Sequence, residues 1–307
     1  MGEQDLIPVL VIGGGPASVA AAIQLKRSFI EVLVITKELG GLVKNANLIE
    51  NLVGFPSGIS GEKYVELMEK HMQSLGIPVN YERVVEVEEE EEEAFFRVKT
   101  ENKEYKAKYL IIGTGTEPLP LDIEGIIEAE ERERVFFNVY DVKPKANKKK
   151  VAIVGGGDAA YDYALNLNEV VEEVFIIQRS KSSKSLVLLQ NRVKKKENIK
   201  VLKETIIENI AVNKAEDELL LTLKMEETTD SFILVVDYLL SAIGRCPNTS
   251  FLTKSLQDSF KESYSSSRLY FIGDIKNGEY RQISLAIGDG IKAAMMVAKE
   301  FNEQFSQ

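Results

Sequence analysis

The chain of 307 residues has a single cysteine, Cys246, and a single histidine, His71. One cysteine excludes an intramolecular disulfide, a catalytic dithiol cycle and a cysteine-held metal cluster. One histidine argues against a His-rich metal site and against a Ser-His-Asp relay. We therefore predict no metal site and no chemistry that depends on a thiol pair.

Long apolar runs and an excess of basic residues are also absent. No segment approaches the ~20 apolar residues that span a bilayer, and Met1 to Pro8 lacks the basic and apolar regions of a secretory signal. These absences predict a cytoplasmic protein without membrane insertion. The net charge of -10 argues against nucleic acid as a partner.

Length and charge distribution suggest more than one domain. A chain of 307 residues with 44% hydrophobic content can bury a large core, and its length predicts about two domains. Lys143 to Lys203 contains 14 Lys or Arg against 6 Asp or Glu, a net charge of +8, so the rest of the chain carries -18. This basic segment is either a solvated face or a field that attracts phosphates or an acidic partner.

Two glycine turns stand about 140 residues apart, each between an apolar strand and a helix. In "PVLVIGGGPASVAAAIQLKR", Gly13 and Gly15 allow a tight turn and the close approach of backbone to a pyrophosphate. In "KKVAIVGGGDAAYDYALNL", Gly155, Gly157 and Ala160 complete GxGxxA. One copy is a weak signal, because such turns also arise for packing, but two copies in the same context predict two bound dinucleotides.

The segments after each turn predict the rest of two α/β domains. Val84 to Pro118 indicates a meander of strands, with the glutamate run Glu88 to Glu93 at a solvated hairpin tip. Near the C-terminus an apolar strand leads to Asp274, and a helix is expected from about Gln282. The Asp274 carboxylate can accept hydrogen bonds from a sugar hydroxyl. Alternatively, Asp274 is only a turn residue.

The order and spacing of these motifs, over nearly the whole chain, resemble those of the low-molecular-weight thioredoxin reductases. The matching motifs are "GGGPAS", Gly40-Gly41, "IEN", "GFPSGISG", "GTG", "GGGDAA", "GRCPNT" and "GDIKNGEYRQ". The resemblance implies an α/β fold of two Rossmann-like three-layer nucleotide-binding domains, and a homodimer. The NAD(P) domain, 118–243, would be inserted in an FAD domain formed by 1–117 and 244–307.

The resemblance also implies which residues contact the cofactors. Those expected at FAD are Gly13, Gly15, Pro16, Ala17, Gly40, Gly41, Asn51, Val84, Thr114, Gly115, Asp274, Arg281, Gln282 and Ile283. Those expected at NADPH or NADH are Gly155, Gly157, Asp158, Ala159, Ala160, Arg179, Lys184, Gly244 and Arg245.

Two departures from the family pattern change the functional expectation. The redox-active Cys-x-x-Cys falls on Asn138 and Asp141, which form neither a thiolate nor a mixed disulfide. The arginine clamp for the 2'-phosphate of NADPH reads "QRSKSSK", with Arg179, Ser180 and Lys184 left to hold a phosphate, so NADPH and NADH both stay open. The region around Asn138 also partly resembles the ferredoxin-NADP reductases built on the same fold, which lack the dithiol.

The sequence thus predicts an oxidoreductase that passes electrons from NAD(P)H through FAD to an external acceptor. The basic segment would attract an acidic ferredoxin or flavodoxin, whereas a quinone or oxygen would need no such field. The alternative is a flavin-binding redox sensor or assembly protein without turnover, and a disulfide reductase is disfavoured. Asp141 would either deliver a proton or make a structural hydrogen bond.

Overall fold

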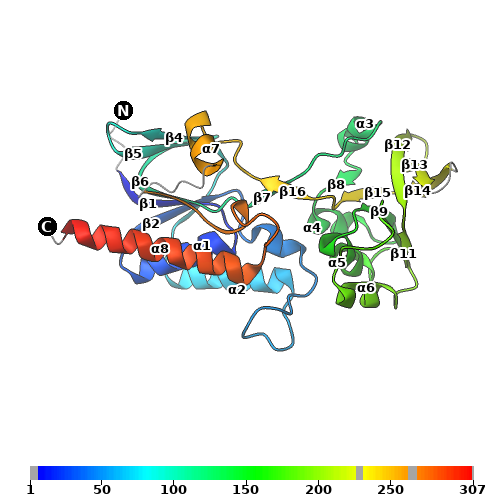
Figure 1. Cartoon of the computed structure of the whole chain (residues 1–307), viewed down its shortest axis with the longest axis horizontal. Coiled ribbons are helices and arrows are strands. Elements are labelled where there is room, and N and C mark those ends of the chain that lie inside the picture. Colours follow the sequence, from blue (N-terminus) through cyan, green and yellow to red (C-terminus); the bar gives the residue numbers. More distant parts are fainter. Residues whose placement is uncertain (1–5, 226–230, 262–267, 306–307) are drawn as a thin grey trace. The chain divides into compact units, whose positions relative to one another are not determined.

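The computed structural model describes residues 6–225, 231–261 and 268–305. The chain divides into two compact units, and each is described here by itself (Figure 1). Unit 1 comprises Met1–Lys44, Ile49–Glu117 and Cys246–Gln307, and unit 2 comprises Asn45–Leu48 and Pro118–Arg245. The short segment Asn45–Leu48 therefore groups with unit 2, although the chain on both sides of it belongs to unit 1.

Unit 1 is built on a seven-stranded sheet with strand order β3-β2-β1-β6-β5-β4, in which β17 also pairs with β6. Its strands are β1 (Ile7–Ile12), β2 (Val32–Thr36), β3 (Val79–Tyr81), β4 (Val84–Glu90), β5 (Phe95–Thr100), β6 (Glu104–Ile112) and β17 (Leu269–Phe271). The pairs among β3, β2, β1, β6 and β17 are parallel, and β4-β5-β6 is an antiparallel meander. The apolar run of β1 is buried because both faces of the sheet are covered.

Helices α1, α2 and α8 cover one face of this sheet, and the meander and helix α7 cover the other. The helices of unit 1 are α1 (Pro16–Arg27), α2 (Gly61–Ser74), α7 (Lys254–Lys261) and α8 (Ile283–Phe305), with the 3-10 turns η1 (Gly41–Asn45) and η3 (Gly273–Ile275). One core gathers Val9, Leu25 and Val297 between the sheet and α1, α2 and α8. The second core lies on the meander side and includes Phe96 and Leu256.

Unit 2 repeats the three-layer arrangement. A parallel sheet has strand order β11-β10-β9-β15-β8, and a separate antiparallel sheet has order β12-β13-β14. The strands are β8 (Val135–Phe136), β9 (Lys150–Val154), β10 (Glu173–Ile177), β11 (Ile199–Leu202), β12 (Thr205–Asn213), β13 (Glu218–Met225), β14 (Ser231–Val236) and β15 (Tyr238–Ser241). The helices are α3 (Ile126–Glu131), α4 (Val139–Val142), α5 (Asp158–Leu167) and α6 (Val187–Val193), with the 3-10 turn η2 (Lys143–Lys145).

Each layer of unit 2 has its own core. Ile153, Tyr161 and Leu167 belong to the core between the parallel sheet and α4 and α5, and Leu221 and Phe175 to the core under the antiparallel sheet. The chain passes between the units through β7 (Thr116–Pro118) and β16 (Arg245–Pro247), which pair as a two-stranded sheet. The mixed α/β architecture with two parallel sheets confirms the predicted fold class.

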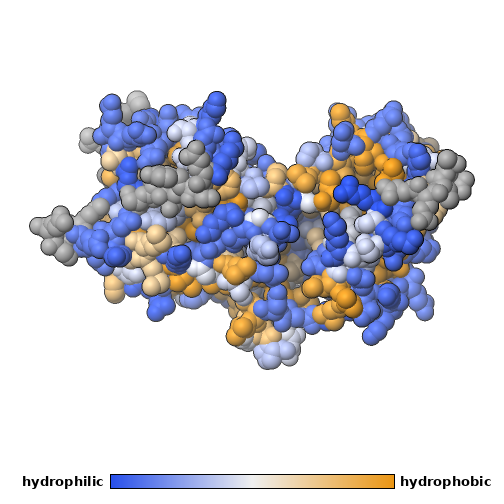
Figure 2. All heavy atoms as spheres, viewed as in Figure 1, coloured by the Kyte–Doolittle hydropathy of each residue, from blue (hydrophilic) through white to orange (hydrophobic). Residues whose placement is uncertain are grey.

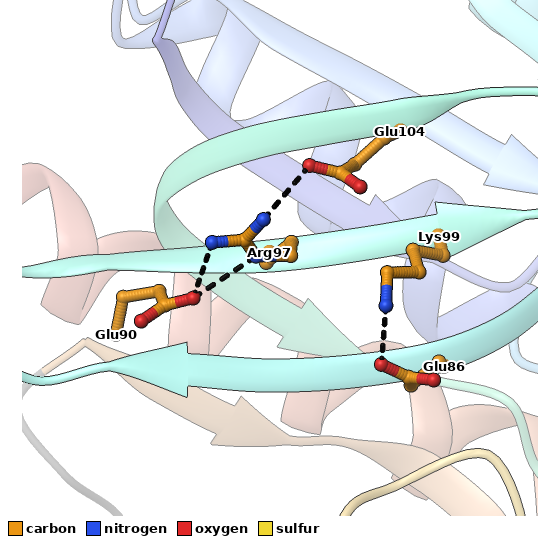
Figure 3. Close-up of polar contacts among 5 residues, drawn as sticks. All are labelled: Glu86, Glu90, Arg97, Lys99 and Glu104. Carbon is orange, nitrogen blue, oxygen red and sulfur yellow. Dashed lines mark hydrogen bonds and ion pairs between the residues drawn. The ribbon is translucent and has the colours of Figure 1, made fainter.

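The predicted meander and its acidic hairpin tip are present in unit 1. The glutamate run ends β4 and continues through the turn before β5, where Glu91, Glu92 and Glu93 are exposed. On the strands, Arg97 pairs with Glu90 and Glu104, and Lys99 Nζ lies 2.7 Å from Glu86 Oε1 (Figure 3). These cross-strand pairs and the solvated tip explain the acidic run as a structural feature.

No helix in the described parts of the chain is long and apolar enough to cross a membrane. Within the same residues, no cluster of His, Cys, Asp or Glu side chains is arranged to hold a metal ion.

Candidate dinucleotide-binding sites

The first glycine turn joins β1 to α1, and packing explains its first two glycines. Gly13 has φ +117°, and a Cβ on it would lie 2.3 Å from the carbonyl oxygen of Gly113. A Cβ on Gly14 would lie 2.2 Å from the carbonyl oxygen of Glu38. These positions exclude any side chain whether or not a ligand is bound.

Gly15 has no such internal reason to be glycine. Its backbone is extended, with φ -78° and ψ 176°, and a Cβ there would meet nothing within 4 Å. It is the N-cap of α1, which has neither a side-chain cap nor an acidic residue in its first turn. An open surface at an uncapped helix N-terminus fits a ligand phosphate that approaches the backbone closely.

The structure brings the second glycine motif of unit 1 to this turn. Gly40 N–H donates to the Gly14 carbonyl over 2.8 Å, and a Cβ on Gly41 would lie 3.7 Å from Gly15 Cα. Gly273 meets the same helix, because its Cβ would lie 2.8 Å from Ala17 Cβ. Since Gly273 begins η3, Asp274 is also held next to the N-terminal turn of α1.

The start of α8 carries the next group of predicted contacts. The helix begins at Ile283, and Gln282 Oε1 accepts a hydrogen bond of 2.7 Å from Asn51 Nδ2. Asp289, nearly two helical turns further on, accepts from Gly273 N–H at 3.2 Å and from Asn277 Nδ2 at 2.9 Å. These contacts tie α8, η3 and the Asn51 loop together, with Arg281 immediately before the helix.

Three predicted contacts of this set, Thr114, Gly115 and Val84, also make structural contacts within unit 1. Thr114 Oγ1 donates to the Asn248 carbonyl at 2.9 Å, and Asn248 N–H donates to the Gly115 carbonyl at 3.1 Å, so both residues close the chain near its crossing. Val84 packs against the core on the meander side of the sheet. The contacts that place the other residues beside the glycine turn do not include Val84.

The second glycine turn, between β9 and α5, repeats the features of the first. Gly155 has φ +144°, and its Cβ would lie 2.4 Å from the Ala242 carbonyl oxygen. Gly157 has φ -96° and ψ -177°, and its Cβ would meet nothing within 4 Å. Ala160 is fully buried, as the third position of GxGxxA requires for close packing of helix and strand. In both turns, therefore, only the last of the three glycines, Gly15 or Gly157, faces open space.

Asp158 and Ala159 open α5 at this turn, and both are exposed. The Asp158 carboxylate stabilises the positive end of the helix and accepts from Leu186 N–H at 2.7 Å. Gly244 follows the neighbouring strand β15 with φ +140°, and its carbonyl accepts from Leu119 N–H at 3.1 Å. Arg245 begins β16.

The loop after β10 is fastened to the second turn and leaves two cations exposed. Lys184 N–H and Ser183 Oγ both donate to the Gly156 carbonyl at 2.9 Å. Gln178 is buried, donates to the Ser180 carbonyl at 2.8 Å and accepts from Tyr161 Oη at 3.1 Å, so it points inward. The side chains of Arg179 and Lys184 are exposed and form no ion pair within the described residues, which leaves them available to a phosphate.

Asn138, at the first expected dithiol position, forms hydrogen bonds with Asn45 and with Asp141 at the second. Asn45 is 5% exposed, and its Nδ2 donates to Asn138 Oδ1 at 3.1 Å while its Oδ1 accepts from Tyr140 N–H at 3.2 Å. Asn138 Nδ2 donates to Asp141 Oδ2 at 3.0 Å, and Asn166 Nδ2 donates to the Asn45 carbonyl at 3.2 Å. We call Asn45, Asn138, Asp141 and Asn166 the asparagine clamp. It satisfies every polar atom of the buried Asn45 side chain.

The clamp holds the segment Asn45–Leu48 on α4 and α5. A further hydrogen bond joins Asn47 N–H to Asp162 Oδ2 at 3.1 Å. The sequence did not mark Asn45 or Asn166, because an isolated asparagine carries no signal until its partner is known. Cys246 is half-buried, with its Sγ 3.8 Å from the Glu117 carbonyl oxygen.

Comparison with known proteins identifies the family of this chain. The family model described as pyridine nucleotide-disulphide oxidoreductase matches residues 7–290. The chain belongs to this family. Members use FAD and a nicotinamide nucleotide, so the protein is a thioredoxin reductase-like, FAD-dependent NAD(P)H oxidoreductase, as the sequence resemblance predicted.

Relatives match over nearly their whole length. A protein of Clostridium pasteurianum named "34.2 kDa protein in rubredoxin operon" is 27% identical over 97% of this chain and 98% of its own. The thioredoxin reductase of Treponema pallidum is 29% identical over 94% of this chain and 95% of its own. The solved thioredoxin reductase of Lactococcus lactis superposes with a TM-score of 0.87 at 25% identity, covering 97% of this chain and 99% of its own.

The residues of both turns fit the family's cofactors. Each turn has one glycine that packing does not require and that a bound pyrophosphate does, followed by a helix N-terminus without a side-chain cap. We take this pair of open glycines as the structural reason to place one dinucleotide at each turn.

Proposed function

We propose that the protein passes electrons from NAD(P)H to an external acceptor and does not reduce disulfides through a thiol pair of its own. The observation that carries this proposal is the asparagine clamp: Asn138 and Asp141 fill the dithiol positions and are hydrogen-bonded to each other. For a one-electron carrier the balance is one NAD(P)H and two oxidised carriers giving one NAD(P)⁺, one H⁺ and two reduced carriers.

We assign FAD to unit 1 and the nicotinamide nucleotide to unit 2. In unit 1 the backbone at Gly15 and Gly41 would hold the pyrophosphate, and Asp274 the sugar hydroxyls. FAD supplies the exchange between a two-electron donor and one-electron acceptors. The protein binds and orients the two dinucleotides, and the uncapped N-terminus of α1 stabilises negative charge.

In unit 2 the backbone at Gly157 would hold the nucleotide pyrophosphate. Arg179 and Lys184 are the groups that can meet a 2'-phosphate, which supports NADPH as a donor. NADH needs neither cation. Comparison of the two nucleotides therefore belongs in any assay of the protein.

The acceptor we propose is a small electron-carrier protein, with a quinone as the runner-up. The name of the Clostridium pasteurianum relative places that protein in a rubredoxin operon, and rubredoxin is an electron carrier. Names of other relatives indicate thioredoxin reductases, but the family's route to thioredoxin needs the dithiol that this chain lacks.

The test uses the two open glycines as a matched pair. Neither Gly15→Val nor Gly157→Val creates an internal clash at Cβ or needs a left-handed backbone, so both proteins should fold. We expect Gly15→Val to lose FAD, and Gly157→Val to keep FAD but lose NAD(P)H-dependent ferricyanide reduction by at least about 100-fold.

The readouts are the flavin absorbance of each purified variant, anaerobic bleaching by NADPH and by NADH, and ferricyanide reduction. If neither nucleotide bleaches wild-type protein that contains FAD, the reductase proposal fails and a sensor without turnover takes its place. If Gly157→Val stays fully active, the nucleotide assignment to the second turn is wrong.

A further inference from the structure

Three consecutive apolar side chains stand exposed beside the second glycine turn. Leu186, Val187 and Leu188 are 60%, 69% and 52% exposed. In Figure 2, hydrophobic residues reach the surface over the region that α5 and α6 occupy in Figure 1. Single exposed apolar residues are common, but three in a row at the start of a helix expose a continuous apolar patch.

The segment that carries them is fixed by hydrogen bonds. Leu186 N–H is held by Asp158 Oδ1 at 2.7 Å, and Gln190 Nε2 donates to the Ser185 carbonyl at 2.7 Å. Ser185 N–H in turn donates to Ser183 Oγ at 3.0 Å, and Ser183 is bonded to the glycine turn. The patch is therefore presented on an ordered framework, which lowers the entropy lost when a partner binds.

Basic residues continue the patch along the same face. Lys194, Lys195 and Lys196 follow α6, are all exposed, and form no ion pair among the described residues. Lys194 keeps helical backbone angles, φ -57° and ψ -22°, so Val187, Lys194 and Lys195 lie at helical spacings on one stripe. From Val187 to Lys195 this stripe is about 12 Å long. We call Leu186 to Leu188 with Lys194 to Lys196 the α6 patch.

Charge decides what kind of partner fits the α6 patch. The chain as a whole has a net charge of -10, but the segment Lys143 to Lys203, which contains these lysines, carries +8. Three lysines without an ion pair among the described residues, next to an apolar centre, give an acidic partner an attractive region, and the apolar centre supplies the area that is desolvated. Glu197 is the one acidic residue that directly follows the lysines.

We propose that the α6 patch is the docking surface for a small acidic one-electron carrier protein. This inference rests on the proposed transfer to an external acceptor, and it names the surface that recruits that acceptor. Docking on unit 2 raises the concentration of the carrier near the enzyme and selects its orientation, so it acts on KM and on the rate of association.

The experiment uses an acidic [2Fe–2S] ferredoxin as the probe and three variants of the full protein with FAD bound. Val187→Ser/Leu188→Ser removes the apolar centre, and Lys194→Gln/Lys195→Gln removes two of the lysines. Lys214→Gln/Lys224→Gln removes the same charge from the β12 and β13 region of unit 2 and serves as the matched control. All replaced side chains are exposed or half-exposed, so the fold should be kept.

We expect both patch variants to raise KM for ferredoxin, and Kd measured by titration calorimetry, about threefold to tenfold. Ferricyanide reduction should stay unchanged, and the control should change KM less than about twofold. Added NaCl should weaken ferredoxin binding to wild type more than to Lys194→Gln/Lys195→Gln.

Three results would overturn the docking proposal. The patch variants could bind ferredoxin as tightly as wild type, or the control variant could lose as much ferredoxin affinity as they do. A changed sedimentation coefficient of the patch variants would mean that a second copy of the chain occupies the patch. Failure of the two proposals can be told apart. If the protein reduces ferricyanide but does not bind ferredoxin, only the docking proposal is wrong. If it binds ferredoxin at the patch but does not reduce ferricyanide, only the reductase proposal is wrong.

Discussion

Asn138, at one of the two expected dithiol positions, has a structural role in unit 2. Its side chain accepts from Asn45 and donates to Asp141, and Asn45 is buried. A cysteine at this position would leave the Asn45 amide without a strong acceptor. The asparagine clamp attaches the segment Asn45–Leu48 to unit 2.

Replacing Asn138 with Ala should loosen that segment. The Nδ2 group of Asn45 would be buried without its partner, which costs about 1 to 3 kcal/mol. We expect amide hydrogen exchange at residues 45–48 to accelerate by about 5-fold to 100-fold, measured by mass spectrometry. Asn191→Ala, at an exposed asparagine of α6, is the control and should change nothing there. Unchanged exchange in Asn138→Ala would mean that the clamp does not hold the segment.

The two roles considered for Asp141 are separated by Asp141→Asn. An amide oxygen still accepts from Asn138 Nδ2 but cannot carry an acid proton. With the structural role, ferricyanide reduction and its pH profile should match wild type. A lost limb of the pH profile would restore the proton-delivery hypothesis.

At the residue scale, a residue of the candidate site could be predicted where a single short motif contains both the residue and the local structure that requires it. Gly15 and Gly157 are of this kind, because the turn, the helix start and the open glycine lie within a few residues. Asn45 is not, since its partners Asn138 and Asn166 come 93 and 121 residues later in the chain. For Thr114, the sequence showed that the residue follows a strand. It could not show the hydrogen bond from Thr114 to the Asn248 carbonyl.

At the scale of elements, the alternation of apolar and polar residues and the turn residues predicted the meander of unit 1. They did not mark Glu82, whose carboxylate joins its strands. Glu82 accepts from Thr100 Oγ1 at 2.5 Å and from Tyr105 Oη at 3.0 Å, and Asn80 Nδ2 donates to the same Tyr105 oxygen at 3.0 Å. The hydrogen bond from Thr100 is the main reason that the pKa of Glu82 lies below its usual value, and Tyr105 and Lys103 add to it. The cluster ties the chain after β3 to β5 and β6.

Glu82→Gln should therefore destabilise unit 1 in a pH-dependent way. A lowered pKa in the folded state means that the stabilisation is complete above the unfolded pKa of about 4.3 and is lost as the pH falls through the folded pKa. We expect a loss of about 1 to 2 kcal/mol at pH 7 that shrinks below about pH 4, measured by urea unfolding with circular dichroism. Glu101→Gln removes an exposed carboxylate nearby and should be neutral. Equal losses of unfolding free energy at pH 7 and below about pH 4 would show that packing, and not the charge of Glu82, is responsible.

On the scale of the whole molecule, the sequence repeat becomes two three-layer units, each with a core on both faces of its parallel sheet. The two glycine turns made this organisation predictable, because each turn requires a strand, a helix and a parallel neighbour strand. The grouping of Asn45–Leu48 with unit 2 was not predictable, since it depends on side chains of unit 2 that meet this segment only in the folded chain.

A homodimer is the last property expected from the resemblance, and we propose α8 as its interface. Leu285, Ile291 and Met295 are 50%, 37% and 58% exposed on this helix of 23 residues. Gly288 lies on the same face, and a Cβ there would meet nothing within 4 Å. A glycine inside a helix costs about 1 kcal/mol relative to alanine, and the close approach of a second copy would explain it where packing within the chain does not.

We expect the protein to sediment as a dimer at micromolar concentration and Met295→Glu to shift it to monomers, because a buried carboxylate without a partner opposes association. Ile233→Glu, at an apolar residue of β14 that is 63% exposed, is the matched exchange on unit 2 and should leave the dimer intact. Dissociation by Ile233→Glu alone would move the interface to β14. A wild-type monomer would refute the dimer, and the open glycine of α8 would then need another explanation.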